Sequence, residues 1–205
     1  MVNVGIIDSD ASARNNTVTH LLADHIGREK RPIHILFEVE RATLVPDAMP
    51  HSPDVVLIDI ARQDPRTIEK VKRQFPDAEV IVLTNIYDVK TVRACFRGGA
   101  VSYLIKETCL SYLHFTISIS LNNGSFISPR INRALIDQTY LTKKYEDMLT
   151  ARELQIANGI AEGLSYKMIA DQYHISLDTV RIYIKRVYRK LNINSKGELM
   201  AQFSI

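Results

Sequence analysis

Short apolar runs alternate with longer amphipathic segments through the first half of the chain. Five apolar runs predict β-strands, at Val2–Ile7, Ile33–Phe37, Val55–Ile58, Val80–Leu83 and Ser102–Ile105. Helical periodicity follows each run, near Ala11–His25, Arg41–Met49, Arg66–Phe75, Val89–Arg97 and Cys109–Leu121. Continuous apolar runs are typical of parallel strands that are buried on both faces. The alternation therefore predicts an α/β domain with a doubly wound, five-stranded parallel sheet.

One segment carries two patterns. Residues 115–121 alternate apolar and polar side chains, which is a strand signature. Leu110, Leu113, Ile117 and Leu121 nevertheless keep helical spacing across the same region. We predict a helix, because the sheet otherwise lacks its last covering element.

The C-terminal quarter predicts a smaller all-α domain of four short helices. Thr150 with Glu153 three residues later forms a capping box, and Ser165 and Ser176 are candidate caps of the next two helices. A final helix is expected from Lys196 to Phe203. Two helices joined by a turn of three to four residues, around His174, make a helix-turn-helix pattern.

The third of these helices, residues 177–191, has two different faces. Val180, Ile184, Val187 and Leu191 form one apolar stripe. Five basic residues lie off that stripe, at Arg181, Lys185, Arg186, Arg189 and Lys190. A helix that is docked by one face and cationic on the other suits the major groove of DNA.

A polar stretch separates the two predicted domains. Asn122, Asn123 and Gly124 mark the end of the last helix of the α/β domain, and Ser128 with Pro129 begins a short helix that we expect to end near Asp137. We expect residues 140–147 to be a mobile connection. The predicted organisation is an α/β domain over residues 1–122, a linker with a short helix over 123–147, and a helix-turn-helix domain over 148–205.

Charge and cysteine content narrow the class of protein. From Leu149 onward the chain has eight Lys or Arg and five Asp or Glu, so this segment holds the whole net charge of +3. Cys95 and Cys109 lie in apolar surroundings, as expected of thiols in a reducing compartment. No apolar run approaches a membrane span, and no signal-peptide pattern opens the sequence. We expect a cytoplasmic protein with no membrane partner.

Polar residues follow the predicted strands at their carboxyl ends. Asp8 and Asp10 follow the first strand, Asp59 the third, Thr84 the fourth and Lys106 the fifth. These ends form the ligand crevice of an open parallel sheet. Converging carboxylates suit Mg²⁺, and a hydroxyl with an ammonium group can hold phosphoryl oxygens. The pattern predicts phosphoryl transfer with Asp59 as the nucleophile.

These segments resemble the receiver domain of bacterial response regulators, which implies a flavodoxin-like fold. The resemblance covers residues 1–122 and rests on residues 4–8, 53–59, 80–84 and 99–106. It implies that Asp59 accepts phosphate from a histidine kinase and that Asp8, Asp59 and the backbone carbonyl of Ala61 hold Mg²⁺. It also implies that Thr84 senses the phosphoryl group, that Lys106 pairs with it, and that Tyr103 changes rotamer on activation.

The sequence departs from the receiver pattern at two positions. Ser9 stands where the family has a second adjacent acid, and the next acid is Asp10. Arg62 adds a cation shortly after Asp59. Both departures weaken the expected Mg²⁺ site. They keep open an alternative in which the regulator works without phosphorylation and its acidic pocket is degenerate.

The C-terminal segment is similar to the LuxR-type helix-turn-helix. Residues 149–153, 160–170, 175–181 and 188–191 match it closely, and the two domains together resemble the NarL/FixJ class of response regulators. Geometry with this resemblance implies that Arg181, Ile182 and Lys185 read base edges. Phosphate contacts are expected from the other candidates, which are Lys167, Thr179, Tyr183 and Lys190.

The sequence therefore predicts a DNA-binding transcriptional regulator of a two-component system that binds double-stranded DNA as a homodimer. Leu199, Met200 and Phe203 leave an apolar face on the last helix, which either packs inside the domain or forms that dimer. An enzyme acting on an external substrate finds no support, because the chain has no P-loop or Rossmann glycine fingerprint. A further alternative is that the basic helix binds an acidic protein.

Overall fold

The computed structural model describes residues 1–23, 32–46 and 49–203 and divides the chain into two compact units, Met1–Asn132 and Arg133–Ile205. The first unit contains five parallel strands in the order β2-β1-β3-β4-β5. Their bounds are β1 Val2–Ile7, β2 Ile33–Val39, β3 Val55–Ile58, β4 Glu79–Thr84 and β5 Ala100–Ile105. The predicted α/β sheet is confirmed, and the strand ends carry the predicted polar residues on one edge of it.

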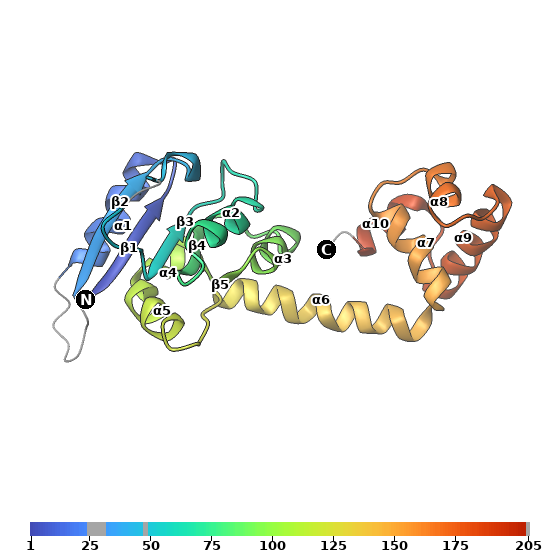
Figure 1. Cartoon of the computed structure of the whole chain (residues 1–205). Helices are drawn as coiled ribbons and strands as arrows, with labels where there is room; N and C mark the ends of the chain where they lie inside the picture. Colours follow the sequence, from blue (N-terminus) through green and yellow to red (C-terminus); the bar gives the residue numbers. More distant parts are fainter. Residues whose placement is uncertain (24–31, 47–48, 204–205) are drawn as a thin grey trace. The chain divides into compact units, whose positions relative to one another are not determined.

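Helices cover the sheet of the first unit (Figure 1). They are α1 Ala11–Leu22, α2 Thr67–Gln74, α3 Val89–Arg97, α4 Lys106–Cys109 and α5 Leu113–Ser120, with 3₁₀ turns η1 Ala42–Leu44 and η2 Leu110–Tyr112. Leu21, Leu113 and Ile117 of α1 and α5 share one buried cluster with strand residues. The ambiguous segment at 115–121 is helical up to Ser120, as predicted.

The predicted helix at Arg41–Met49 is wrong. The chain forms only the three-residue turn η1 there, and residues 47–48 lie outside the described part. Pro46 gives the reason, since a proline disfavours helical backbone at the residue before it, and Val45 is extended. The helix predicted at Ala11–His25 is observed as α1, which ends at Leu22. The last two residues of the predicted range lie outside the described residues.

The predicted short helix after Ser128 is wrong in its length. The helix α6 runs without interruption from Pro129 to Met148, through the stretch expected to be a mobile connection. Its two ends are anchored in different units, with Ile131 buried in the first and Tyr145 in the second. The exposed pair Arg133–Asp137, at 3.3 Å, supports the polar middle of this helix.

The Ser128 hydroxyl anchors the start of α6 to β5. It accepts the N–H of Ile105 at 2.8 Å and donates to the sulfur of Cys109 at 3.1 Å. The backbone of Ser128 also donates to the carbonyl of Tyr103. Cys95 and Cys109 are both free thiols and both buried, as their apolar sequence surroundings predicted.

Four helices form the core of the second unit. They are α7 Ala151–Ala161, α8 Tyr166–Gln172, α9 Leu177–Leu191 and α10 Lys196–Phe203. Thr150 caps α7 with the predicted capping box, and Ser165 and Ser176 cap α8 and α9. None of the described helices is long and apolar enough to cross a membrane.

Candidate functional site

Two buried carboxylates and one ammonium group meet at the carboxyl edge of the sheet. Asp8 follows β1 and Asp59 follows β3, and these strands are neighbours, so both side chains face the same pocket. Lys106 begins α4 after β5, and its Nζ lies 2.6 Å from Asp8 Oδ2 and 2.7 Å from Asp59 Oδ2. The side chains are 4% and 8% exposed for the two acids and 14% for the lysine. The structure thus brings together three of the predicted residues as an ion triad of two buried carboxylates and one partly buried ammonium group.

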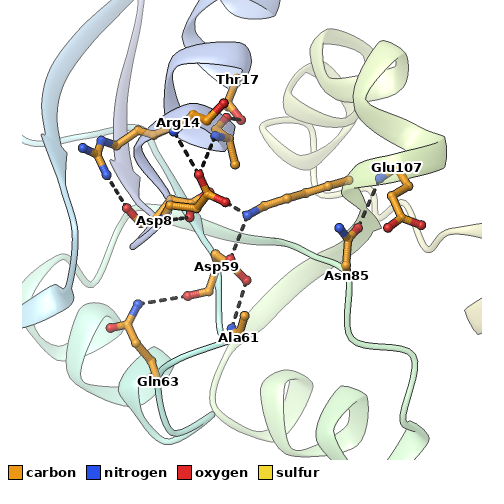
Figure 2. Close-up of polar contacts among 12 residues, drawn as sticks. Asp8, Arg14, Thr17, Asp59, Ala61, Gln63, Asn85 and Glu107 are labelled. Atoms are coloured by element: carbon orange, nitrogen blue, oxygen red, sulfur yellow. Dashed lines mark hydrogen bonds and ion pairs between the residues drawn. The ribbon is translucent and has the colours of Figure 1, made fainter.

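Backbone and side-chain contacts fix the two carboxylates in place (Figure 2). Ala61 donates its N–H to Asp59 Oδ1 at 3.0 Å, and Gln63 Nε2 donates to the Asp59 carbonyl at 2.9 Å. Arg14, from α1, donates to the carbonyl of Asp8. Arg14 and Gln63 were missed by the sequence analysis, because a contact to a backbone carbonyl depends on chain geometry and leaves no signal in residue spacing.

Asp10 does not join the two buried carboxylates. Its side chain caps α1 by accepting the N–H groups of Ser12 and Ala13 at 2.9 and 3.0 Å. The hydrogen bond from Ala13 is the largest cause that holds the pKa of Asp10 below its usual value. The acid that follows Ser9 therefore stabilises the helix N-terminus and leaves the pocket with one acid after β1.

Thr84 and Tyr103 lie on the neighbouring strands β4 and β5. The Thr84 hydroxyl is buried and has no hydrogen-bond partner among the described residues. Tyr103 is also buried and donates its hydroxyl to the carbonyl of Ile86 at 2.9 Å, in the loop that follows Thr84. Burial raises the pKa of Tyr103, so this hydroxyl stays protonated and able to donate.

Ser9 and Arg62 lie outside the group of Asp8, Asp59 and Lys106. Both line a cavity beside the acidic pocket, with Ser9 half-buried and Arg62 exposed. Within the described residues, no group of three or more His, Cys, Asp or Glu side chains is placed to hold a metal ion. The pocket itself offers two carboxylates, those of Asp8 and Asp59.

In the second unit, the apolar stripe of α9 docks the helix as predicted. Val180, Ile184, Val187 and Leu191 are all buried in the cluster shared with α7, α8 and α10. Asn192 ends the helix in the left-handed conformation, with a φ of 54°. Burial of one side leaves the opposite side of α9 facing outward.

The outward face of α9 carries the predicted base readers. Arg181 and Lys185 are exposed, and Ile182 is 51% exposed between them. Arg181 pairs with Asp178 one turn earlier, at 2.9 Å, with both side chains more than half exposed. An exposed pair of this kind is weak and exchanges easily for another anion.

The predicted phosphate-contacting residues have different surroundings. Lys167 on α8 is exposed, whereas Thr179 is half-buried with its hydroxyl 2.8 Å from that of Ser176. Tyr183 is half-buried, and the Arg186 guanidinium lies 5.7 Å from the centroid of its ring. The structure places these side chains on or beside the outward surface of the helix-turn-helix.

Lys190 has a partner inside its own domain. Its Nζ lies 2.6 Å from Oε2 of Glu153, whose side chain is 4% exposed. The same oxygen accepts the backbone N–H of Thr150 at 2.8 Å. Burial alone raises the pKa of Glu153, but the hydrogen bonds from Lys190 and Thr150 outweigh it and lower that pKa below 4.5. Lys190 therefore ties the end of α9 to the start of α7.

The turn before α9 lies at His174, as predicted, and depends also on Arg152, which the sequence analysis did not single out. His174 has a φ of 51°, which is the left-handed region. Arg152 donates to the carbonyl of Tyr173 at 2.9 Å, and its guanidinium lies 5.2 Å from the centroid of the Tyr173 ring. Arg152 thereby holds the turn against α7.

The apolar face of α10 packs within its own unit. Leu199 is fully buried, and the ring of Phe203 stacks on Tyr145 at a centroid distance of 4.4 Å. Tyr145 also donates its hydroxyl to the carbonyl of Gln202 at 3.2 Å. Packing inside the domain, one of the two expected uses of this face, accounts for Leu199 and Phe203.

Comparison with known proteins supports the helix-turn-helix assignment of the second unit and the response-regulator assignment of the chain. Residues 147–202 match the model of the family described as bacterial regulatory proteins, luxR family. The nitrate/nitrite response regulator protein homolog of Haemophilus influenzae is 32% identical over 153 residues, which cover 73% of each chain. The oxygen regulatory protein NreC of Staphylococcus carnosus is 27% identical over 165 residues, which cover 74% of this chain and 76% of the relative.

Solved structures share the fold. RcsB from Salmonella enterica serovar Typhimurium, bound to promoter rprA in the presence of a phosphomimetic, gives a TM-score of 0.61 at 20% identity over 100% of this chain and 98% of that one. The RcsB–DNA complex gives 0.60 at 20% identity, over 99% and 98%. The Haemophilus influenzae relative, together with the luxR-family match, shows that the chain belongs to the NarL/FixJ type of two-component response regulators.

Proposed function

We propose that this chain is a transcriptional regulator that binds double-stranded DNA and is controlled by phosphorylation of Asp59 by a histidine kinase. The observation that carries the proposal is the ammonium of Lys106 held between Asp8 and Asp59 in a buried pocket. A buried charge balance of this kind changes sharply when one carboxylate becomes an acyl phosphate. Membership of the response-regulator family favours this proposal over a regulator that works without phosphorylation.

The pocket residues have separate tasks in phosphoryl transfer. A carboxylate oxygen of Asp59 forms a bond to phosphorus while the P–N bond of a phosphohistidine breaks, and that electron pair returns to the imidazole. Lys106 balances the negative charge carried by the phosphoryl oxygens. The buried Thr84 hydroxyl, which has no partner among the described residues, is free to donate to one of those oxygens. Tyr103 stays hydrogen-bonded to the same loop through Ile86.

The donor set fits a magnesium ion, with fewer carboxylates than the family pattern. Asp8, Asp59 and the carbonyl of Ala61 would hold it, whereas Ser9 lines the neighbouring cavity and adds no carboxylate. The ion would supply positive charge beside the phosphoryl oxygens. Because Asp10 caps α1 and Lys106 already neutralises part of the acidic charge, we expect weak Mg²⁺ binding.

The outward face of α9 supplies the DNA contacts in this proposal. Arg181, Ile182 and Lys185 are exposed where a major groove is read. We propose that Lys167, Thr179 and Tyr183 contact phosphates, while Lys190 positions α9 through Glu153. We propose binding as a homodimer that reads two half-sites, as in the RcsB dimers bound to DNA.

The proposal places the protein in the cytoplasm, where DNA and the phosphohistidine of a kinase are both accessible. It assigns the chain a regulatory role with no turnover of an external substrate. The known relatives carry names of regulators, which supports this role.

The test combines phosphate incorporation with DNA binding by the full chain. Acetyl phosphate with Mg²⁺ should label the native protein, and Asp59→Asn should remove the label completely. Binding to duplex DNA should weaken steeply as salt rises, because phosphate contacts release counterions. Labelling that survives Asp59→Asn would contradict the assigned acceptor, and binding without salt dependence would contradict the assigned DNA interface.

A further inference from the structure

A cavity of about 430 Å³ lies beside the acidic pocket of the first unit. Its walls come from η1, from α2 and from the segments after β1, β2 and β3. Two hydrogen bonds hold η1 and the residues after it against the other walls: Ala42 N–H to Gln63 Oε1 at 3.2 Å, and Gln74 Nε2 to the Pro46 carbonyl at 3.3 Å. The hollow occurs where a longer helix was predicted and the chain forms only the short turn η1.

The lining of this cavity is strongly cationic. Arg41, Arg62 and Lys70 reach it from three different segments, and Glu40 is the one acid among its lining residues. Hydroxyls come from residues that include Ser9 and Thr67. Three cations around a concave surface of this size create a local positive potential that attracts anions.

These cations differ from other basic residues nearby. Arg66 pairs with Asp64 at 2.7 Å, and Arg73 pairs with Glu69 at 3.4 Å. Within the described part of the chain, Arg41, Arg62 and Lys70 make no ion pair within 4.0 Å, although Glu40 lines the same cavity. Their guanidinium and ammonium donors are available to an occupant.

We propose that this cavity binds a small metabolite that carries a phosphate group. The volume lies within the usual range for small-molecule sites. A phosphate dianion accepts hydrogen bonds from several directions, which matches two arginines, one lysine and hydroxyls on separate walls. Ser9 favours anion binding in this cavity, because the second acid that receiver domains usually have at this position would repel the phosphate.

The site adjoins the phosphoacceptor through two residues. Gln63 contacts both the carbonyl of Asp59 and the wall residue Ala42, and Ser9 directly follows Asp8. An occupant adds negative charge beside Asp59 and consumes the cations that attract an anionic phosphodonor. Occupancy therefore slows phosphorylation of Asp59. The slower phosphorylation rests on the proposed function, whereas the binding of phosphate in the cavity does not.

The binding test uses inorganic phosphate as the probe and the unphosphorylated full chain. ¹H–¹⁵N spectra recorded during the titration, at constant ionic strength set with chloride, should shift the amides of Ser9, Ala42, Gln63 and Thr67. Arg41→Gln and Lys70→Gln should each weaken binding about tenfold or more. Arg73→Gln is the matched control, because Arg73 lies on the same helix, pairs with Glu69 and does not line the cavity.

Asp59→Asn should still bind phosphate, and more tightly than the native chain because a nearby negative charge is gone, which separates this site from phosphotransfer. Loss of binding in this variant would overturn the proposal. Shifts centred on Thr84 and Lys106 would place the anion in the acidic pocket and overturn the proposal. Equal weakening by Arg73→Gln would reveal general attraction to the surface and would also overturn it. Suppose that binding is confirmed but acetyl phosphate labels Asp59 at the same rate with the cavity saturated as with the cavity empty. The inference that occupancy slows phosphorylation of Asp59 is then wrong.

Discussion

Positive charge is handled in opposite ways in the two halves of this protein. Lys106 is only 14% exposed, and its ammonium group lies within 2.7 Å of two buried carboxylates. Arg181 and Lys185 of α9 are exposed, and the ion pair of Arg181 with Asp178 lies in solvent. The first arrangement is sensitive to a change of one charge, and the second keeps its charge available to a polyanion.

This difference separates control from recognition. A new phosphoryl group on Asp59 alters a balance inside a pocket of low exposure, where Coulomb interactions are strong. On α9, screening by solvent weakens each contact, so DNA affinity must come from several cations acting together. Substitutions should therefore affect stability in the pocket around Lys106 and DNA affinity on the outward face of α9.

The largest effect is expected for Lys106→Met. This substitution leaves Asp8 and Asp59 buried side by side with no cation, which should lower the free energy of unfolding by about 3 kcal/mol. Urea denaturation followed by circular dichroism measures it. Addition of Mg²⁺ should restore part of the loss. Unchanged stability would show that the triad contributes no net energy and would break the comparison.

Arg181→Gln should act on DNA binding and leave stability almost unchanged. If Arg181 contacts a base, the loss of discrimination between specific and random duplexes should be about 2 kcal/mol. Fluorescence anisotropy on both duplexes measures it, with the exposed Arg189→Gln as the matched control. Equal weakening on both duplexes would place Arg181 on the DNA backbone.

Lys190→Met should have a smaller effect on stability than Lys106→Met. It removes the partner of Glu153, but the lysine side chain is 35% exposed and solvent screens the pair. We expect a loss of about 1 kcal/mol in the free energy of unfolding. Retention of full stability together with a loss of DNA affinity would identify Lys190 as a phosphate contact instead.

The smallest effect is a pH dependence that originates at Glu153. Its pKa in the folded state lies below its ordinary value of 4.5, so the ionised form stabilises the fold. That stabilisation is present above pH 4.5 and is lost as pH falls through the folded-state pKa. Glu153→Gln should flatten this part of the stability profile in acid titrations of Tm. Identical profiles for the native protein and the variant would contradict the assignment.

Local periodicity made much of the fold predictable from the sequence. The bounds of β1, β3, α3 and α10 agree with the predicted ranges, and every residue of the α9 stripe is buried. The failures have local causes as well. Pro46 stops helix formation after η1, and α6 continues because tertiary packing of Tyr145 against Phe203 anchors its far end.

The candidate pocket was only partly predictable. Asp8, Asp59 and Lys106 were identified because strand ends converge in a parallel sheet. The capping role of Asp10, the contact from Arg14 and the bridge through Gln63 require the path of the chain between strands. The cavity beside them was not expected, since it exists where a predicted helix fails to form.

The most direct test of the account is the affinity of the full chain for a specific operator duplex before and after treatment with a phosphodonor. The account predicts a changed affinity for the native protein and no change for Asp59→Asn. The same response from both proteins would show that the charge balance around Lys106 does not control the helix that binds DNA.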